Sequence, residues 1–386
     1  DSRADKSTDG NAEDRGTLKS ASRNKARRKS GGGKKARSSE ERKASKRKKP
    51  EDLLPEDAPQ EFLNREIEWI EFNARVLHEA LDARTPLLER VRFLGIFTSN
   101  LDEFFMKRVG GLKRQVEAGV QRRAGGLTPI QQLAAIRVRV RPLLDQQAEC
   151  YRLLAKKDLP ERGIHLLAWD ELQPVEKEFA TQYFRRNVFP VLTPLAVDPG
   201  LPFPFLSNLS TSLGVTLRHP ERDEKLFARI KVPKIFPQWI QVRVEEAGRN
   251  QFRFVSLMDL ICHNMRWLFP DMEVLDVMPF RITRNAEIER DEDDVEDLLE
   301  MIAEELKQRR FGDVVRLEHG PDPDPWMLEF LMNELELTAA EVYEEPALLD
   351  YTDLKPIADL TIPELKYAPW TPLVPPALIE EKDDFF

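Results

Sequence analysis

Apolar residues return every three or four positions through residues 59–160, and this spacing predicts a bundle of α-helices. Asn64 is suited to cap the first helix, because a short polar side chain there can accept hydrogen bonds from free backbone amides. The predicted buried stripe of that helix consists of Ile67, Ile70, Ala74, Leu77 and Leu81. Short connections between the first three helices favour antiparallel packing.

Local start signals predict the second and third helices. Thr85 is expected to cap the second helix, with Pro86 as its first residue, because the missing proline amide hydrogen is not needed in the first turn. The third helix is expected to begin at Asn100, with the Asn100 side chain as its cap. Glu103, three residues later, would complete a capping box.

A fourth and longer helix is predicted to open at Thr128-Pro129. Pro142 lies inside it and is expected to kink or interrupt it, because proline removes one backbone hydrogen bond.

Residues 161–372 alternate short apolar runs with helical patterns, which predicts an α+β domain. A helix carrying Val175, Phe179 and Tyr183 should be capped by Asp170, and another, capped by Ser256, should run to Leu268. The proline-rich segment 190–205 is expected to be neither helix nor central strand. Strands are predicted at 164–167, 213–217, 226–232, 274–282 and 314–317, and two further helices at 293–310 and 326–335.

The first fifty residues differ sharply in composition from the rest. They carry 18 Lys or Arg against 7 Asp or Glu, whereas the whole chain has a formal net charge of −9. Their only large aliphatic residue is Leu18, so they cannot bury enough apolar surface to form a core. We therefore expect a disordered basic tail over residues 1–58. It is either a solvated tail without a specific partner or an electrostatic tether for a polyanion.

The predicted architecture is thus multidomain: an all-α N-terminal helical bundle (59–160) is followed by an α+β head domain (161–372), and a disordered basic N-terminal tail (1–58) precedes both.

Few residues point to chemistry by themselves. The chain has no phosphate-binding loop of the Gly-x-x-x-x-Gly-Lys-Ser/Thr type and no Cys-x-x-Cys pair. Five scattered histidines predict no metal site, and the carboxylates at 291–294 are better placed to favour a helix start. Two cysteines, Cys150 and Cys262, fit a reducing compartment. No apolar run is long enough for a membrane helix.

Several motifs nevertheless resemble one enzyme family, the large, histidine-phosphorylating bacterial polyphosphate kinases. The most specific is Ser99-Asn100-Leu101-Asp102-Glu103-Phe104-Phe105-Met106. The stretches 62–77 and 86–96 resemble the opening of the same enzymes. The stretches 193–195, 280–287 and 306–312 resemble their head domain, and 367–372 resembles the entrance to their catalytic half.

This resemblance implies a reaction in which the terminal phosphate of ATP is transferred reversibly to inorganic polyphosphate, through a phosphohistidine and with Mg²⁺. It implies that residues 373–386 begin a truncated catalytic half, and that the catalytic histidine and the Mg²⁺ ligands lie outside this chain. It also implies ATP, ADP and polyphosphate as partners and homo-oligomer contacts through the head domain. One site residue carries over: Asn100 matches the N-terminal-domain asparagine that contacts ATP.

Two points stay open at this stage. Asn100 suits a helix cap as well as an ATP contact, and both roles could coexist. A non-catalytic module that binds nucleic acid or another polyanion through the tail is the alternative function. Without the catalytic half, the chain alone is expected to be inactive. We expect a cytoplasmic location, with membrane association as a further option.

Overall fold

The computed structural model describes residues 63–197, 203–221, 224–242, 251–286 and 312–373. The predicted tail, the predicted helix at 293–310, the carboxylates at 291–294 and most of 373–386 lie outside these residues. In chain order the principal elements are α2 (Arg65–Leu81), α3 (Leu87–Phe104), α4 (Gly110–Glu117), α5 (Pro129–Leu153), β1 (Ile164–Leu167), α6 (Pro174–Tyr183), β2 (Leu195–Val197), β3 (Thr211–Arg218), β4 (Lys225–Lys231), β5 (Trp239–Gln241), β6 (Phe252–Ser256), α7 (Leu257–Cys262), β7 (Glu273–Arg284), β8 (Val314–His319), α9 (Pro325–Glu334), β9 (Val342–Glu344) and α10 (Lys355–Ala358).

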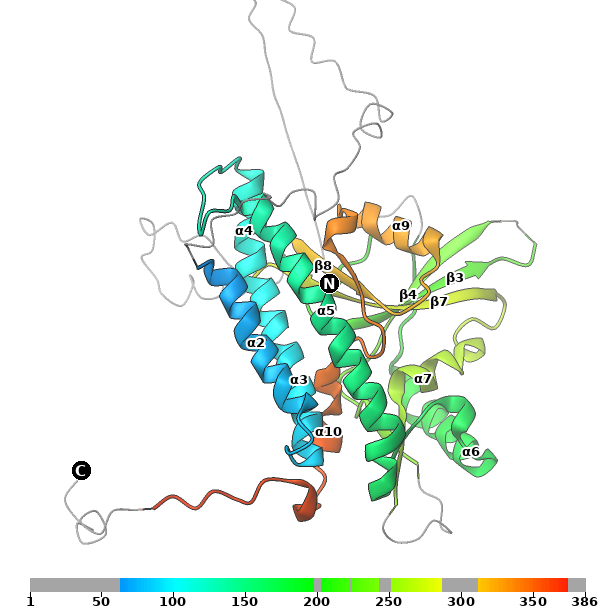
Figure 1. Cartoon of the computed structure of the whole chain (residues 1–386). Helices are drawn as coiled ribbons and strands as arrows, with labels where there is room; N and C mark the ends of the chain where they lie inside the picture. Colours follow the sequence, from blue (N-terminus) through cyan, green and yellow to red (C-terminus); the bar gives the residue numbers. More distant parts are fainter. Residues whose placement is uncertain (1–62, 198–202, 222–223, 243–250, 287–311, 374–386) are drawn as a thin grey trace, which may run out of the picture. The chain divides into compact units, whose positions relative to one another are not determined.

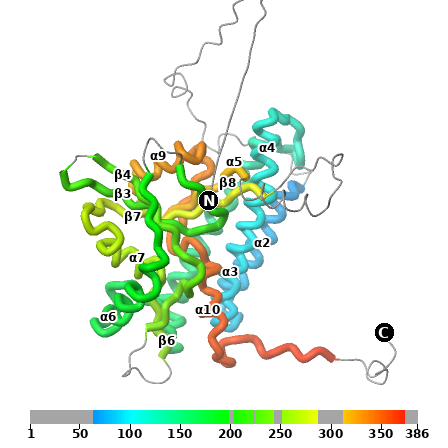
Figure 2. Tube along the Cα trace, turned by 180° about the vertical axis from the view of Figure 1, so that it is seen from behind, coloured from blue at the N-terminus to red at the C-terminus, as the bar shows by residue number. Residues whose placement is uncertain are grey.

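The helical part is built around α2, α3 and α5, which run side by side in both views (Figures 1 and 2). Their shared apolar core includes Leu77, Leu94, Phe97 and Val140, all almost fully buried. The same core also takes residues from the C-terminal end of the described chain, around Tyr351 and α10. The helical layer is therefore completed by residues distant in the sequence.

The strands form two sheets. The smaller has the order β1-β6-β5, with β1 and β6 parallel. The larger has the order β2-β4-β3-β7-β8-β9 and is antiparallel except for the β8–β9 pair. Residues alternate across β3: Leu213 and Val215 pack in the core that includes α6 and α7, whereas Gly214 faces Met327 of α9. A Cβ at Gly214 would lie 2.5 Å from the Met327 sulfur, so any other residue there would require the Met327 side chain to shift. The order of the helices and the two sheets confirms the predicted class, a helical N-terminal region followed by an α+β region.

Several local predictions are confirmed. Asn64 caps α2, since its Oδ1 accepts hydrogen bonds from the amides of Glu66 and Ile67 at 3.0 and 3.2 Å. Ser256 caps α7, although this helix ends at Cys262 rather than Leu268. The five predicted strands correspond to β1, β3, β4, β7 and β8, and the helix predicted at 326–335 corresponds to α9.

The predicted start of a third helix at Asn100 is wrong. Helix α3 runs without a break from Leu87 to Phe104, and a π-helical turn (Phe105–Val109) joins it directly to α4. Thr85 does not act as a cap either, because Pro86 occupies the N-cap position and the helix begins one residue later. A capping-box sequence therefore lies in the middle of a helix, where packing against α2 outweighs the local start signal.

Pro142 does not interrupt α5, which continues through it as one 25-residue helix; the kink expected at Pro142 stays a prediction. The cap predicted at Asp170 is wrong. Asp170 lies in a short 3₁₀ turn rather than at the start of α6. Leu172 is extended, and α6 begins at Pro174 after a capping box between Gln173 and Glu176.

Candidate functional site

Asn100 lies one turn before the end of α3, on the side that faces α2. It is half-buried, and its Nδ2 donates a hydrogen bond to Oδ1 of Asn73 at 3.1 Å. Asn73 is only 1% exposed, and its own Nδ2 donates to the Phe97 carbonyl at 3.1 Å. Asn100 is therefore not needed as a cap, and its side chain is held by a buried partner on the neighbouring helix.

The orientation of the Asn100 amide follows from hydrogen-bonding capacity. The Phe97 carbonyl can only accept, so Asn73 must direct its NH₂ group there and its oxygen toward Asn100. Asn100 must then donate one of its two N–H bonds to Asn73. Its carbonyl oxygen and second N–H have no further partner among the described residues, which gives the side chain one acceptor and one donor for a ligand.

The groups beside Asn100 follow the antiparallel packing of α2 and α3. One turn before Asn73 on α2, Trp69 stacks on Phe104, which lies one turn after Asn100 on α3. Their ring centroids are 4.6 Å apart and their planes differ by 13°. One turn further, Arg108 lies 4.0 Å from the Glu66 carboxylate and is 43% exposed. We call this line of residues, Asn73–Asn100, Trp69–Phe104 and Glu66–Arg108, the α2/α3 seam. It offers an amide, an aromatic surface and a partly free guanidinium.

The opposite side of α3 carries a buried ionic network. Asp102 accepts hydrogen bonds from both Arg281 of β7 and Arg316 of β8, one of them at 2.8 Å. The two arginines also pair with Glu318, at 3.0 and 3.1 Å. Asp350 lies 3.7 Å from Arg281, and all five side chains are at most 5% exposed. The network joins the helical part to the larger sheet.

The charges in this network are strongly coupled. Burial alone would lower the pKa of Arg281, but Asp102, Glu318 and Asp350 raise it well above its usual value, so Arg281 stays charged. Burial raises the pKa of Glu318 in spite of both arginines. Burial, and then repulsion from Glu318, raises the pKa of nearby Glu345 well above its usual value. Burial and neighbouring carboxylates thus oppose the ionisation of Glu345.

Two motifs quoted from the sequence meet at this network. Asp102, in the stretch 99–106, pairs with Arg281, in the stretch 280–287. The π-helical turn adds a second link, because the Met106 carbonyl accepts a hydrogen bond from the Ala286 amide at 2.9 Å. Both motifs were visible in the sequence, but no role was predicted for Asp102, Arg281, Arg316 or Glu318. Their opposite charges within apolar runs could have indicated buried ion pairs.

The described residues contain no cluster of three or more His, Cys, Asp or Glu side chains arranged to hold a metal ion. Cys150 and Cys262 are free thiols. None of the described helices combines the length and apolar character that crossing a bilayer requires. Asn100, the one site residue predicted from the sequence, lies within the part of the chain that the structure describes.

Comparison with known proteins identifies the family. The family model for the polyphosphate kinase N-terminal domain matches residues 62–167, and that for the polyphosphate kinase middle domain matches residues 175–357. The chain is 44% identical over 335 residues to the polyphosphate kinase of Thermosynechococcus vestitus, covering 86% of this chain and 46% of that protein. It is 46% identical over 327 residues to the Synechocystis enzyme, covering 83% of this chain and 45% of the enzyme. Identity to the Mycobacterium tuberculosis enzyme is 44% over 340 residues, covering 86% and 45%.

The crystal structure of polyphosphate kinase from Porphyromonas gingivalis has the same fold over 83% of this chain and 45% of that chain, with a TM-score of 0.68 and 23% identity. The fold and the two matched domains therefore define the class as the N-terminal and middle domains of a polyphosphate kinase. The chain belongs to the polyphosphate kinase family. It spans slightly less than half the length of the curated relatives that it matches.

Proposed function

We propose that this chain is the N-terminal part of an enzyme that transfers the terminal phosphate of ATP reversibly to inorganic polyphosphate through a phosphohistidine. The observation that carries this proposal is the 44–46% identity to polyphosphate kinases through both the helical and the α+β parts. The same comparisons do not favour the alternative of a nucleic-acid-binding module that acts through its tail.

In this proposal Asn100 contacts ATP. Its free carbonyl oxygen and N–H can pair with a nucleotide edge or a phosphate oxygen, and buried Asn73 keeps it from rotating. Arg108, further along the α2/α3 seam, would attract the triphosphate. Phosphoryl transfer depends on positioning and on cations around the transferred group, so a preset contact at the nucleotide contributes binding and orientation.

The remaining chemistry is assigned to residues outside the described part of this chain. In this proposal Mg²⁺, the phosphohistidine and most phosphate contacts belong there, as the family resemblance implies. Domain limits at residues 58, 160 and 372, assembly as a homo-oligomer through the head domain, polyanion binding by the tail and a cytoplasmic location also belong to this proposal.

The test is to incubate the 386-residue chain with ATP labelled at the terminal phosphate, Mg²⁺ and a polyphosphate primer. We expect neither acid-labile label on the protein nor growth of the primer, although saturation-transfer NMR should detect contact with ATP. Acid-labile label on this chain would show that the phosphorylated histidine lies within it. Absence of any ATP contact would contradict the assignment of a nucleotide-binding role.

A further inference from the structure

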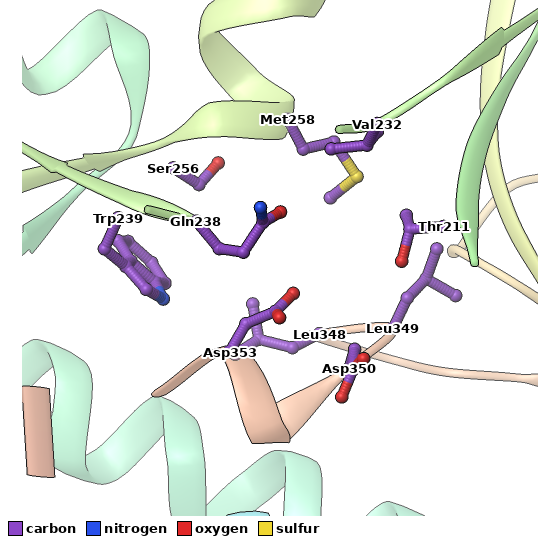
Figure 3. Close-up of a pocket in the computed structure, with 10 residues that line it drawn as sticks. All are labelled: Thr211, Val232, Gln238, Trp239, Ser256, Met258, Leu348, Leu349, Asp350 and Asp353. Carbon is purple, nitrogen blue, oxygen red and sulfur yellow. The ribbon is translucent and has the colours of Figure 1, made fainter. Parts of the chain in front are cut away.

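A cavity separate from the α2/α3 seam lies between strands β3, β5 and β6 and the segment 348–353. It encloses about 400 Å³ of empty space, including the part open to solvent (Figure 3). Its lining consists of Thr211, Val232, Gln238, Trp239, Ser256, Met258, Leu348, Leu349, Asp350 and Asp353. Half of these side chains are apolar, so the polar ones decide what can bind.

Three of the polar side chains are already engaged. Ser256 caps α7 by accepting the Asp259 amide at 3.0 Å. Asp350 holds the Lys234 ammonium at 2.9 Å and caps the turn that starts at Tyr351. Gln238 donates its NH₂ group to the carbonyls of Pro233 and Phe236, which leaves its Oε1 as a free acceptor.

Two polar groups have no partner among the described residues. The Thr211 hydroxyl is buried without a hydrogen bond, although the residue is only 6% exposed. A buried hydroxyl that lacks a partner costs free energy, so a donor that reaches it from the cavity would stabilise the protein. The Asp353 carboxyl forms no hydrogen bond or ion pair, and Figure 3 shows it directed into the cavity.

The charges around Asp353 leave a negative excess. The groups that face it are Asp350, Lys234 and Arg281, and the last two are already paired with Asp350. Burial, and then repulsion from Asp350, raises the pKa of Asp353 to about 7. Above that pH the cavity holds a carboxylate without a counterion, and a cation would supply one.

We propose that this cavity binds a small primary alkylammonium ion. Such an ion carries three N–H donors, and three residues of the cavity lining carry acceptors without a partner among the described residues: the Asp353 carboxylate, Gln238 Oε1 and Thr211 Oγ1. Trp239 adds an aromatic ring, which favours a cation. The site lies outside the proposed ATP contact, and its test does not depend on kinase activity.

The probe is methylammonium chloride, titrated calorimetrically into the 386-residue chain at pH 8 in a buffer free of primary amines. Wild type should bind it saturably, and tetramethylammonium, which has no N–H bond, should not bind. Asp353→Asn should weaken binding about tenfold or more, because it removes a charge-assisted hydrogen bond. Thr211→Val should weaken binding by a smaller factor.

The control is Glu364→Gln, which removes one exposed carboxylate from the same C-terminal region and should leave binding unchanged. Asp353→Asn and Thr211→Val are close in size to the native residues, and thermal melting will confirm that both fold. Three outcomes would overturn the proposal: no binding of methylammonium to wild type, equal binding to Asp353→Asn, or equally tight binding of tetramethylammonium.

Discussion

Two polar residues of one motif, Asn100 and Asp102, lie two positions apart on α3 but in opposite surroundings. Two residues of an α-helix are separated by about 200°, so one side chain faces the α2/α3 seam and the other faces the sheet. Asn100 is half-buried and keeps unused hydrogen-bonding groups. Asp102 is 3% exposed and is held by two arginines.

Within the eight-residue motif 99–106, the surroundings of Asn100 suit a ligand contact, whereas those of Asp102 suit a structural role. A side chain with free donors and acceptors at a partly open surface can meet a ligand. A carboxylate enclosed by two guanidinium groups cannot, but its loss would leave two buried arginines with fewer opposing charges, since only Glu318 and Asp350 would still pair with them. The motif that identifies the family thus carries both a candidate contact and the link between helices and sheet.

The largest effect is expected from breaking the network. Asp102→Asn keeps the size of the side chain but removes the charge that Arg281 and Arg316 share. Removing one partner from a buried ionic group costs about 3–5 kcal/mol of unfolding free energy. Urea unfolding monitored by circular dichroism would measure this loss.

Glu103→Gln is the matched control, because Glu103 is the next residue and pairs with Lys107 on the exposed surface. Its effect should stay within about 0.5 kcal/mol. Equal effects of the two substitutions would show that the buried network contributes no more than a surface pair.

A smaller loss is expected at the partner of Asn100. Asn73→Ala removes the hydrogen bonds to Phe97 and Asn100 at a fully buried position, which should cost about 1–3 kcal/mol. Asn333→Ala, at an exposed place on α9, is the control and should be nearly neutral. If Asn73→Ala were as stable as that control, Asn73 would not be the residue that fixes Asn100.

Asp353, which lies beside Asp350 of the network, should make the stability of the chain depend on pH. The folded-state pKa of Asp353 is about 7, above the model-compound value of 3.8, so the folded chain holds a proton that the unfolded chain releases. This group therefore lowers stability as pH rises from about 4 to 7, and its penalty is complete above pH 7. Asp353→Asn should raise the melting temperature relative to wild type at pH 8 and change it little below pH 4. A melting temperature that is lower at pH 8 would contradict this sign.

The sequence predicted the element types better than their limits. Alternating and helical spacing located β3, β7 and α2 because each buries one regular face. The false start at Asn100 arose because Asn and Glu at capping-box spacing also occur inside a helix, and only the contact with Asn73 reveals the difference. Charges inside apolar runs were visible in the sequence, but their pairing was not predictable, because positions 102, 281, 316, 318 and 350 meet only through the fold. The family resemblance pointed to Asn100, whereas periodicity alone supported only a cap.

The most direct test of the central claim is ATP contact measured by saturation-transfer NMR on wild type, Asn100→Ala and Asn333→Ala. Asn100→Ala leaves the buried Asn73 oxygen without its donor, so it should cost about 1–3 kcal/mol of stability while weakening ATP contact several-fold. Asn333→Ala should match wild type in both respects. If Asn100→Ala, correctly folded, contacted ATP as well as wild type does, Asn100 would have no part in nucleotide binding and the role proposed for the α2/α3 seam would be wrong.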